Sequence, residues 1–204
     1  MKIKNWMKPN PKTIHRTALL QEAQDLMKKH SIRHLPVVED DQLVGFITES
    51  DLRQFSFPSM VEEIPVHQVM VLNPITVNAN ASIETAARLI HDYKIGGLPV
   101  LDKKRLVGII TASDLLSAFI EVLGLFKAST RIDVVIDKKS GLEDVTRIIN
   151  EHGGEIISVA IESHAARRKV HYFRLERCDP APIVEALEEA GHKVVSVMEL
   201  GLIA

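Results

Sequence analysis

GFITESDL, at Gly45–Leu52, returns as GIITASDL at Gly108–Leu115, with six of the eight letters unchanged and a spacing of 63 residues. The same shift aligns residues 7–52 with residues 70–115 without a gap, and roughly 19 of the 46 aligned pairs are identical. Only a few identical pairs are expected by chance at this composition. The first 128 or so residues therefore contain two copies of one structural unit.

Each copy shows the same order of predicted elements. A short extended segment follows a proline, and an amphipathic helix comes next, with apolar residues at helical spacing. The runs LPVV and LPVL predict a strand whose proline belongs at the start of the strand or at a sheet edge. LVGFIT and LVGIIT predict a second strand, after which Ser-Asp-Leu opens another helix with the Asp or Ser as its N-cap. Because a β-α-β-β-α unit of this size cannot bury its sheet alone, we expect the two copies to pack on each other.

The composition is ordinary for a folded chain of 204 residues, with 46% hydrophobic and 25% charged residues. A net charge of −2 gives no overall attraction to nucleic acid or to an acidic membrane. No apolar run approaches the ~20 residues needed to span a bilayer. The basic N-terminus lacks the apolar region of a secretory signal, and Cys178 is the single cysteine. We expect a cytoplasmic protein whose partners include neither membrane nor nucleic acid.

The duplicated unit, with its Leu-Pro-Val run and its Gly-x-Ile-Thr-x-Ser-Asp-Leu ending, resembles the CBS domain pair over residues 7 to about 120. The resemblance implies a regulatory sensor that binds adenine nucleotides (AMP, ADP or ATP) or related adenosyl ligands between the two units. A carboxylate at a helix start can accept hydrogen bonds from both ribose hydroxyls, while Thr and Ser hydroxyls can contact sugar or phosphate.

In the CBS family each cleft combines the Thr-x-Ser-Asp of one unit with the first strand and the Leu-Pro strand of the other. Carried onto this sequence, the resemblance implies a first cleft of Thr111, Ser113 and Asp114 with Thr13, Ile14, His15, Arg33, His34, Leu35 and Pro36. It implies a second cleft of Thr48, Ser50 and Asp51 with Thr76, Val77, Asn78, Gly96, Gly97, Leu98 and Pro99.

The two clefts should differ, because Arg33-His34 precedes one Leu-Pro and Gly96-Gly97 precedes the other. Arginine can bind phosphate with a fixed guanidinium, whereas glycine supplies no side-chain donor. We expect the Asp114 cleft to be the stronger nucleotide site. A structural interpretation stays open for the same residues. Asp51 and Asp114 can serve only as helix caps, the threonines can be ordinary strand residues, and Arg33 and His34 can be a solvated turn pair.

The last third of the sequence changes pattern. An apolar helix is predicted from Leu115 to about Ala128, after which the strands and helices follow the order β-α-β-β-α-β, a ferredoxin-like arrangement. This order resembles the ACT domain, whose ligand loop would place Gly141 next to a bound amino acid. The Asp-x-Pro-Gly often found there is Asp137-Lys138-Lys139-Ser140-Gly141 in this chain, without the proline. A purely dimerising role therefore stays open. The densest basic stretch, residues 165–169, falls in a predicted hairpin turn.

The sequence thus predicts an α+β protein with CBS unit 1 at 1–57, CBS unit 2 with an exit helix at 58–128, and an ACT-like domain at 129–204. This combination resembles bacterial acetoin-utilisation accessory proteins, which implies a regulator of carbon metabolism. Because CBS pairs and ACT-like sheets tend to associate in twos, we expect a homodimer, whose target would be an unidentified protein. Metal-ligand spacings, nucleotide loops and nucleophile motifs are missing, so neither a metal site nor an enzyme is expected. The alternative is an assembly module with vestigial clefts.

Overall fold

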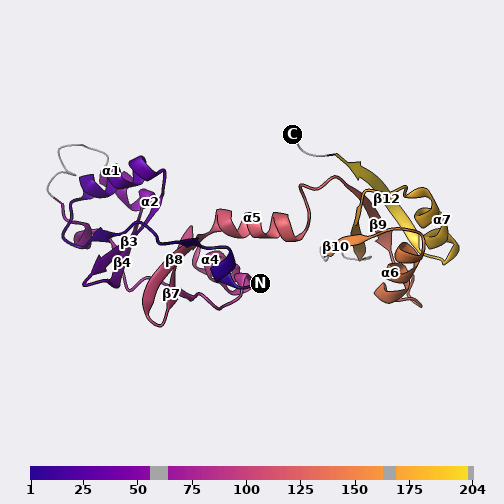
Figure 1. Cartoon of the computed structure of the whole chain (residues 1–204), viewed down its shortest axis with the longest axis horizontal. Coiled ribbons are helices and arrows are strands. Elements are labelled where there is room, and N and C mark those ends of the chain that lie inside the picture. The colour runs from indigo at the N-terminus through magenta and orange to yellow at the C-terminus, as the bar shows by residue number, and fades with distance from the viewer. Residues whose placement is uncertain (56–63, 163–168, 202–204) are drawn as a thin grey trace. The chain divides into compact units, whose positions relative to one another are not determined.

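A computed structural model of the chain describes residues 1–55, 64–162 and 169–201. Two compact units result, Met1–Leu116 and Ser117–Ala204 (Figure 1). Two sequence predictions fall partly outside the described residues: the boundary between positions 57 and 58, and positions 165–168 of the basic stretch. The domain limits 1–57, 58–128 and 129–204 stay a prediction. Within the described ranges, every helix is too short or too polar to cross a membrane.

The two repeats have the same elements in the same order, as the duplication predicts. The first contains η1 (Ile3–Asn5), β1 (Lys8–Pro9), β2 (Ile14–His15), α1 (Leu20–His30), β3 (His34–Glu39), β4 (Gln42–Thr48), α2 (Glu49–Leu52) and η2 (Arg53–Phe55). The second contains η3 (Val66–Gln68), β5 (Val71–Leu72), β6 (Val77–Asn78), α4 (Ile83–Tyr93), β7 (Gly97–Asp102), β8 (Arg105–Thr111) and α5 (Ala112–Val122).

Each repeat gives its first short strand to the sheet of the other repeat. One sheet has the order β2-β3-β4-β5 and the other the order β1-β8-β7-β6, so β1 and β5 are exchanged. Lys8 pairs with Ile109, and Val71 pairs with Phe46 at the matching position. The N-terminus also lies beside α4, where the amide of Ile83 donates to the carbonyl of Met1 (Figure 1). The two repeats therefore form one interlocked unit.

The repeated glycine of the octapeptide makes room for this exchange. A Cβ on Gly45 would overlap the sulfur of Met70, and a Cβ on Gly108 would lie 2.5 Å from the sulfur of Met7. At Gly108 the carbonyl oxygen of Lys8 would also be only 2.9 Å away. Because a Cβ does not approach a backbone oxygen so closely, Gly108 needs to be glycine for close packing, whereas a side chain at Gly45 would require the flexible Met70 to move.

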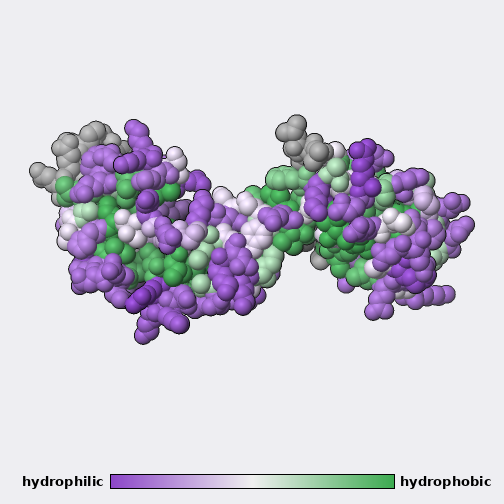
Figure 2. Space-filling model, viewed as in Figure 1, coloured by the Kyte–Doolittle hydropathy of each residue, from purple (hydrophilic) through white to green (hydrophobic). Residues whose placement is uncertain are grey.

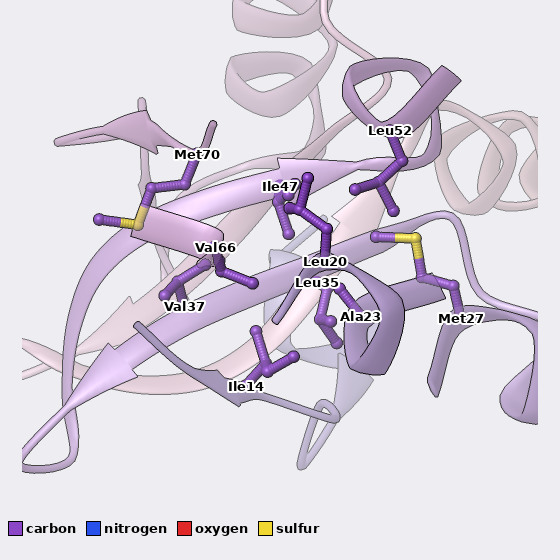
Figure 3. Packing of buried hydrophobic residues seen from close by; sticks show 10 residues of the cluster. All are labelled: Ile14, Leu20, Ala23, Met27, Leu35, Val37, Ile47, Leu52, Val66 and Met70. Atoms are coloured by element: carbon purple, nitrogen blue, oxygen red, sulfur yellow. The ribbon is translucent and has the colours of Figure 1, made fainter. Parts of the chain in front are cut away.

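The core of the first repeat draws on segments far apart in the sequence (Figure 3). Helix α1 contributes Leu20, Ala23 and Met27, the helical spacing seen in the sequence. Val66 and Met70, from the start of the second copy, complete the same cluster. Burying such side chains contributes roughly 1.5–3 kcal/mol each, so the exchanged segment is part of the hydrophobic core.

Pro36 does not occupy the position expected for it. The sequence places this proline at the start of a strand or at a sheet edge, but it is the third residue of β3, an inner strand. The sheet tolerates it because β2 is short and pairs with β3 only at Val37 and Val38. The missing amide of Pro36 therefore has no strand partner to lose on that side.

The predicted exit helix is shorter than expected. It ends at Val122 rather than near Ala128. Gly124 has a φ of +65°, a left-handed conformation that glycine adopts readily and that ends a helix. The amide of Leu125 then donates to the carbonyl of Ile120, which closes the last turn.

The C-terminal unit has the predicted β-α-β-β-α-β order. Its elements are β9 (Ser129–Val135), α6 (Leu142–Glu151), β10 (Ile156–Glu162), β11 (Val170–Glu176), α7 (Ala181–Glu189) and β12 (Lys193–Leu200). All neighbouring strands in the sheet order β10-β11-β9-β12 are antiparallel. Its own core centres on Ile132, Phe173 and Leu175 with residues from α6 and α7. Figure 2 shows hydrophilic residues over the outer surfaces of these two helices, as expected for helices that bury one face.

Candidate functional site

The end of β4 and the start of α2 form a tight polar corner. Both the amide and the hydroxyl of Thr48 donate to Oδ2 of Asp51, at 2.7 and 2.8 Å. The amide of Asp51 lies 3.4 Å from the hydroxyl oxygen of Thr48. The N-cap is therefore Thr48, and Asp51 is the third residue of the helix in a capping box. The prediction of Asp or Ser as the N-cap is wrong by two to three positions, because the strand runs directly into the helix.

The second octapeptide builds the same corner at the start of α5. The amide and hydroxyl of Thr111 donate to Oδ2 of Asp114 at 2.8 and 2.6 Å. In both corners a single carboxylate oxygen carries both capping bonds. Oδ1 of Asp51 has no hydrogen-bond partner among the described residues, and Oδ1 of Asp114 has only a loose ion pair. Capping and ligand binding, which the sequence leaves as alternatives, are thus compatible on one side chain.

His34 lies where the two repeats meet. It is directly opposite Thr48 in the β3–β4 pairing, and its ring stacks on Phe46 with centroids 5.9 Å apart. On its other side are the glycines of the second repeat, since a Cβ on Gly96 would lie 2.7 Å from Nε2 of His34. The imidazole therefore fills the space that a side chain at Gly96 would occupy. The sequence shows His34 in one repeat where the other has Gly97. In the structure these unlike positions fit together, because the imidazole packs against the two glycines.

Burial makes His34 harder to protonate. Desolvation lowers its pKa below the ordinary histidine value of 6.5, and the positive charge of Arg33 lowers it further. The carboxylates of Asp114 and Asp51 raise the pKa, in that order of importance, but less strongly than burial lowers it. His34 is therefore neutral at neutral pH, within the electrostatic reach of both aspartates.

Acidification is expected to destabilise the N-terminal unit through His34. Because folding lowers the pKa of this group, the unfolded chain binds more protons as the pH falls below about 6.5. The contribution of His34 to the free energy of unfolding is complete above that pH and is lost as the pH falls through the folded pKa. Wild type should therefore lose more stability than His34→Gln between about pH 7.5 and about pH 5.5, measured by urea unfolding.

The matched control is His30→Gln, which removes an exposed histidine at the end of α1. Its pH dependence should follow that of wild type, since it keeps the buried imidazole. The same loss of stability on acidification in wild type and in His34→Gln would rule out His34 as the source.

The other predicted cleft residues fall into two groups. Seven of them are buried and form the strand framework behind the corners: Ile14, Leu35, Pro36, Val77, Gly97, Leu98 and Pro99. The exposed group supplies polar side chains or open backbone at the surface: Thr13, His15, Ser50, Asn78, Gly96 and Ser113, while Thr76 is half-buried.

Arg33 is exposed and lies close to the corner of its own repeat. The amide of Glu49, the first residue of α2, donates to the carbonyl of Arg33 at 3.0 Å. The sequence prediction assigns Arg33 to the cleft of Asp114. The binding roles of all these residues stay a prediction.

Sequence reasoning missed Lys8. Its ammonium lies 3.8 Å from Oδ1 of Asp114, with the lysine side chain 73% exposed and the aspartate 13% exposed. Lys8 reaches this corner because β1 is exchanged onto β8, which the sequence does not reveal. The alignment of the two repeats shows Lys8 opposite Val71, but it does not show that Lys8 lies beside Asp114.

Gly141 is the N-cap of α6 in an extended conformation. A Cβ there would meet no atom closer than 4.0 Å, so packing does not require glycine. The loop it ends is held by buried His192, whose Nδ1 lies 3.3 Å from the amide of Asp137 and whose Nε2 lies 3.3 Å from Oδ2 of Asp144. Amino-acid binding at Gly141 stays a prediction. Across the described ranges, no cluster of His, Cys, Asp and Glu side chains could hold a metal ion.

Known proteins with similar sequences share the duplicated part of the chain. A CBS domain-containing protein of Dictyostelium discoideum is 37% identical over 134 residues, which span 59% of this chain and 92% of that protein. Inosine-5'-monophosphate dehydrogenase of Thermoplasma acidophilum is 38% identical over 106 residues, but these make up only 21% of that enzyme. The similarity to this enzyme therefore covers a small part of it.

Three solved structures resemble the same part. The CBS domain pair of protein MJ0100, in complex with 5'-methylthioadenosine and S-adenosyl-L-methionine, is 30% identical (TM-score 0.54, 58% of this chain and 95% of that one). CBSX2 in complex with AMP is 27% identical (TM-score 0.54, 59% and 97%). A Vibrio cholerae protein named as an acetoin utilization protein (AcuB) is 36% identical (TM-score 0.55, 61% and 94%).

The CBS domain family itself matches residues 3–57 and 61–121, one match for each repeat. These two segments include both polar corners and both exchanged strands, and together they cover more than half of the chain. The chain therefore belongs to the CBS domain family and carries a tandem CBS pair in its N-terminal part.

Proposed function

We propose that this protein is a regulatory sensor that binds adenosine-containing ligands in two clefts between its CBS repeats. The observation that carries the proposal is the pair of corners at Asp51 and Asp114. In each corner one carboxylate oxygen is used by the helix cap, and the other has no capping bond. A fixed carboxylate with a spare oxygen is suited to accept hydrogen bonds from the vicinal hydroxyls of ribose.

The solved relatives support this class of ligand. One CBS pair similar to this chain was solved with 5'-methylthioadenosine and S-adenosyl-L-methionine, and another with AMP. All three compounds contain an adenosyl group, and they differ in the group at the 5' position of the sugar. We therefore assign adenosyl recognition to the clefts and leave the choice of 5' group to the residues around each one.

The two clefts are proposed with the residue sets carried over from the family, and the Asp114 cleft is the stronger nucleotide site. The carboxylate oxygens of Asp51 and Asp114 that carry no capping bond suit reversible, noncovalent binding. We propose regulation without catalysis, since the similar part of the dehydrogenase is a minor share of that enzyme. An enzymatic role would predict turnover of a bound nucleotide in a product assay.

The C-terminal unit is proposed to be an ACT-like module that dimerises and responds to the CBS pair. Its β-α-β-β-α-β order and its antiparallel sheet favour this proposal. The similarity to the Vibrio cholerae protein favours a role in acetoin utilisation. We propose that this role is regulatory and that the protein acts in the cytoplasm. An amino acid at Gly141 belongs to the same proposal and is tested with it.

Adenosyl ligands are expected to raise the melting temperature of the N-terminal unit. A ligand that binds only the folded state, at about 100 times its Kd, adds about 2.7 kcal/mol of stability. For a unit of this size that corresponds to roughly 10 °C. The measurement is differential scanning calorimetry of the full chain with AMP, ADP, ATP, 5'-methylthioadenosine, S-adenosyl-L-methionine and a set of amino acids. Inosine and free phosphate are the matched negative controls.

An unchanged melting temperature with every adenosyl compound would contradict the sensor proposal. If light scattering then showed a tight dimer, the assembly-module alternative would be favoured. A shift caused by amino acids alone would place the ligand site in the C-terminal unit.

A further inference from the structure

Lys8 and Val71 occupy equivalent positions in the two exchanged strands. Lys8 pairs with Ile109 next to the second corner, and Val71 pairs with Phe46 next to the first. The pairings are related by the same shift of 63 residues that relates the octapeptides. A cation therefore stands beside Asp114 at the place where an apolar side chain stands in the other repeat.

The contact between Lys8 and Asp114 leaves the ammonium available. At 3.8 Å the pair is at the outer limit of an ion pair, and the lysine side chain is 73% exposed. A pair of this length with one highly exposed partner contributes little to stability. The flexible four-carbon stem of lysine lets the ammonium move by several ångströms toward a nearby anion. Lys8 can therefore change partner when a ligand arrives.

The charged side chains next to Asp51 and Asp114 make the electrostatic environments of the two corners more different. Helix α2 begins with Glu49, beside Asp51, whereas the matching residue of α5 is Ala112. Glu49 forms a loose pair with Arg53 at 3.7 Å, so this arginine is already engaged with a carboxylate. Val71, 53% exposed, adds an apolar surface there. The Asp51 corner thus has two carboxylates, with Arg53 paired to Glu49 and the backbone of Arg33 nearby. The Asp114 corner has one carboxylate with the loosely held Lys8.

We infer that Lys8 divides the ligands between the two clefts by the charge of the 5' group. The Asp114 cleft takes a nucleoside 5'-phosphate, whose anion Lys8 neutralises. The Asp51 cleft takes an adenosyl ligand whose 5' group is uncharged or cationic, because Val71 offers no charge there and Glu49 repels an anion. Vicinal hydroxyls of the ribose bind the aspartate in both clefts, and the 5' group lies across the sugar ring, within the reach of a lysine. The inference rests on the proposed function of the clefts.

Isothermal titration of the full chain with AMP and with 5'-methylthioadenosine tests the inference. Lys8→Met keeps the aliphatic length but removes the charge. It should weaken AMP binding about threefold to tenfold and leave the binding of 5'-methylthioadenosine unchanged. Lys8→Arg should retain AMP binding. In the wild type, raising the salt concentration should weaken AMP binding more than 5'-methylthioadenosine binding.

The reciprocal variant is Val71→Lys, which should give the Asp51 cleft affinity for AMP and so add a second AMP site. Both positions lie at the surface in two-residue strands, and circular dichroism checks that each variant folds. If Lys8→Met weakens both ligands equally, or neither, the charge inference is overturned while the sensor proposal stands. If neither compound binds the wild type, both proposals fail together.

Discussion

Asp114→Ala is expected to weaken AMP binding by at least about tenfold, because it removes the carboxylate proposed to hold the ribose. A hydrogen bond to a charged group contributes roughly 1.5–3 kcal/mol, and one such bond already corresponds to about a tenfold change in Kd. The substitution also removes the acceptor of the two capping bonds from Thr111, at 2.8 and 2.6 Å. Loss of that cap should lower the free energy of unfolding by about 1 kcal/mol.

The chain contains its own control for this loss of stability. Asp51→Ala removes an equivalent cap, with bonds of 2.7 and 2.8 Å from Thr48. It should cost a similar free energy of unfolding, yet leave most of the AMP affinity in place. Calorimetric titration of both variants at equal salt concentration separates the two effects. Equal losses of AMP affinity in Asp51→Ala and Asp114→Ala would contradict the assignment of the nucleotide to the Asp114 cleft.

Phe173→Ala is expected to destabilise the C-terminal unit by about 3–5 kcal/mol. Phe173 is fully buried at the centre of the cluster formed by β9, β11, α6 and α7. Its cluster shares no residue with the core of the first repeat. The loss should therefore appear in the melting of the C-terminal unit, while AMP still stabilises the N-terminal unit.

Scanning calorimetry of the full chain, with hydrogen exchange to assign each transition, measures this effect. Ile47→Ala, at a fully buried position of the first repeat, should lower the free energy of unfolding of the N-terminal unit by about 2–5 kcal/mol. Ile161→Ala, at a side chain 50% exposed on β10, controls for the substitution itself and should change little. A single transition that Phe173→Ala and Ile47→Ala shift equally would show that the two units unfold as one.

Much of the fold could be predicted because the decisive patterns are local and occur twice. The spacing of Leu20, Ala23 and Met27 predicts α1, and the structure buries these three residues. The octapeptides predict a strand that leads into a helix, which is what Thr48 and Asp51 form. Even so, the cap falls on Thr48, because the position of an N-cap depends on where the strand ends.

The exchanged strands could not be predicted in the same way. Lys8–Pro9 and Val71–Leu72 are two residues long, too short for an alternating pattern to show. Their partners lie about 100 residues away in one case and about 25 in the other, as the pairings with Ile109 and Phe46 show. The contact between Lys8 and Asp114 follows from this exchange, so the feature that most distinguishes the two corners is visible only in three dimensions.

The exchange also bears on how such a chain can evolve. Residues 1–9 close the sheet of the second copy, and residues 64–72 close the sheet of the first. A gene that lost either copy would therefore leave its twin with a bare strand edge and an incomplete interior. Each copy therefore depends on the other for a complete sheet. Selection could then let Lys8 and Val71 diverge, since neither repeat has to fold without the other.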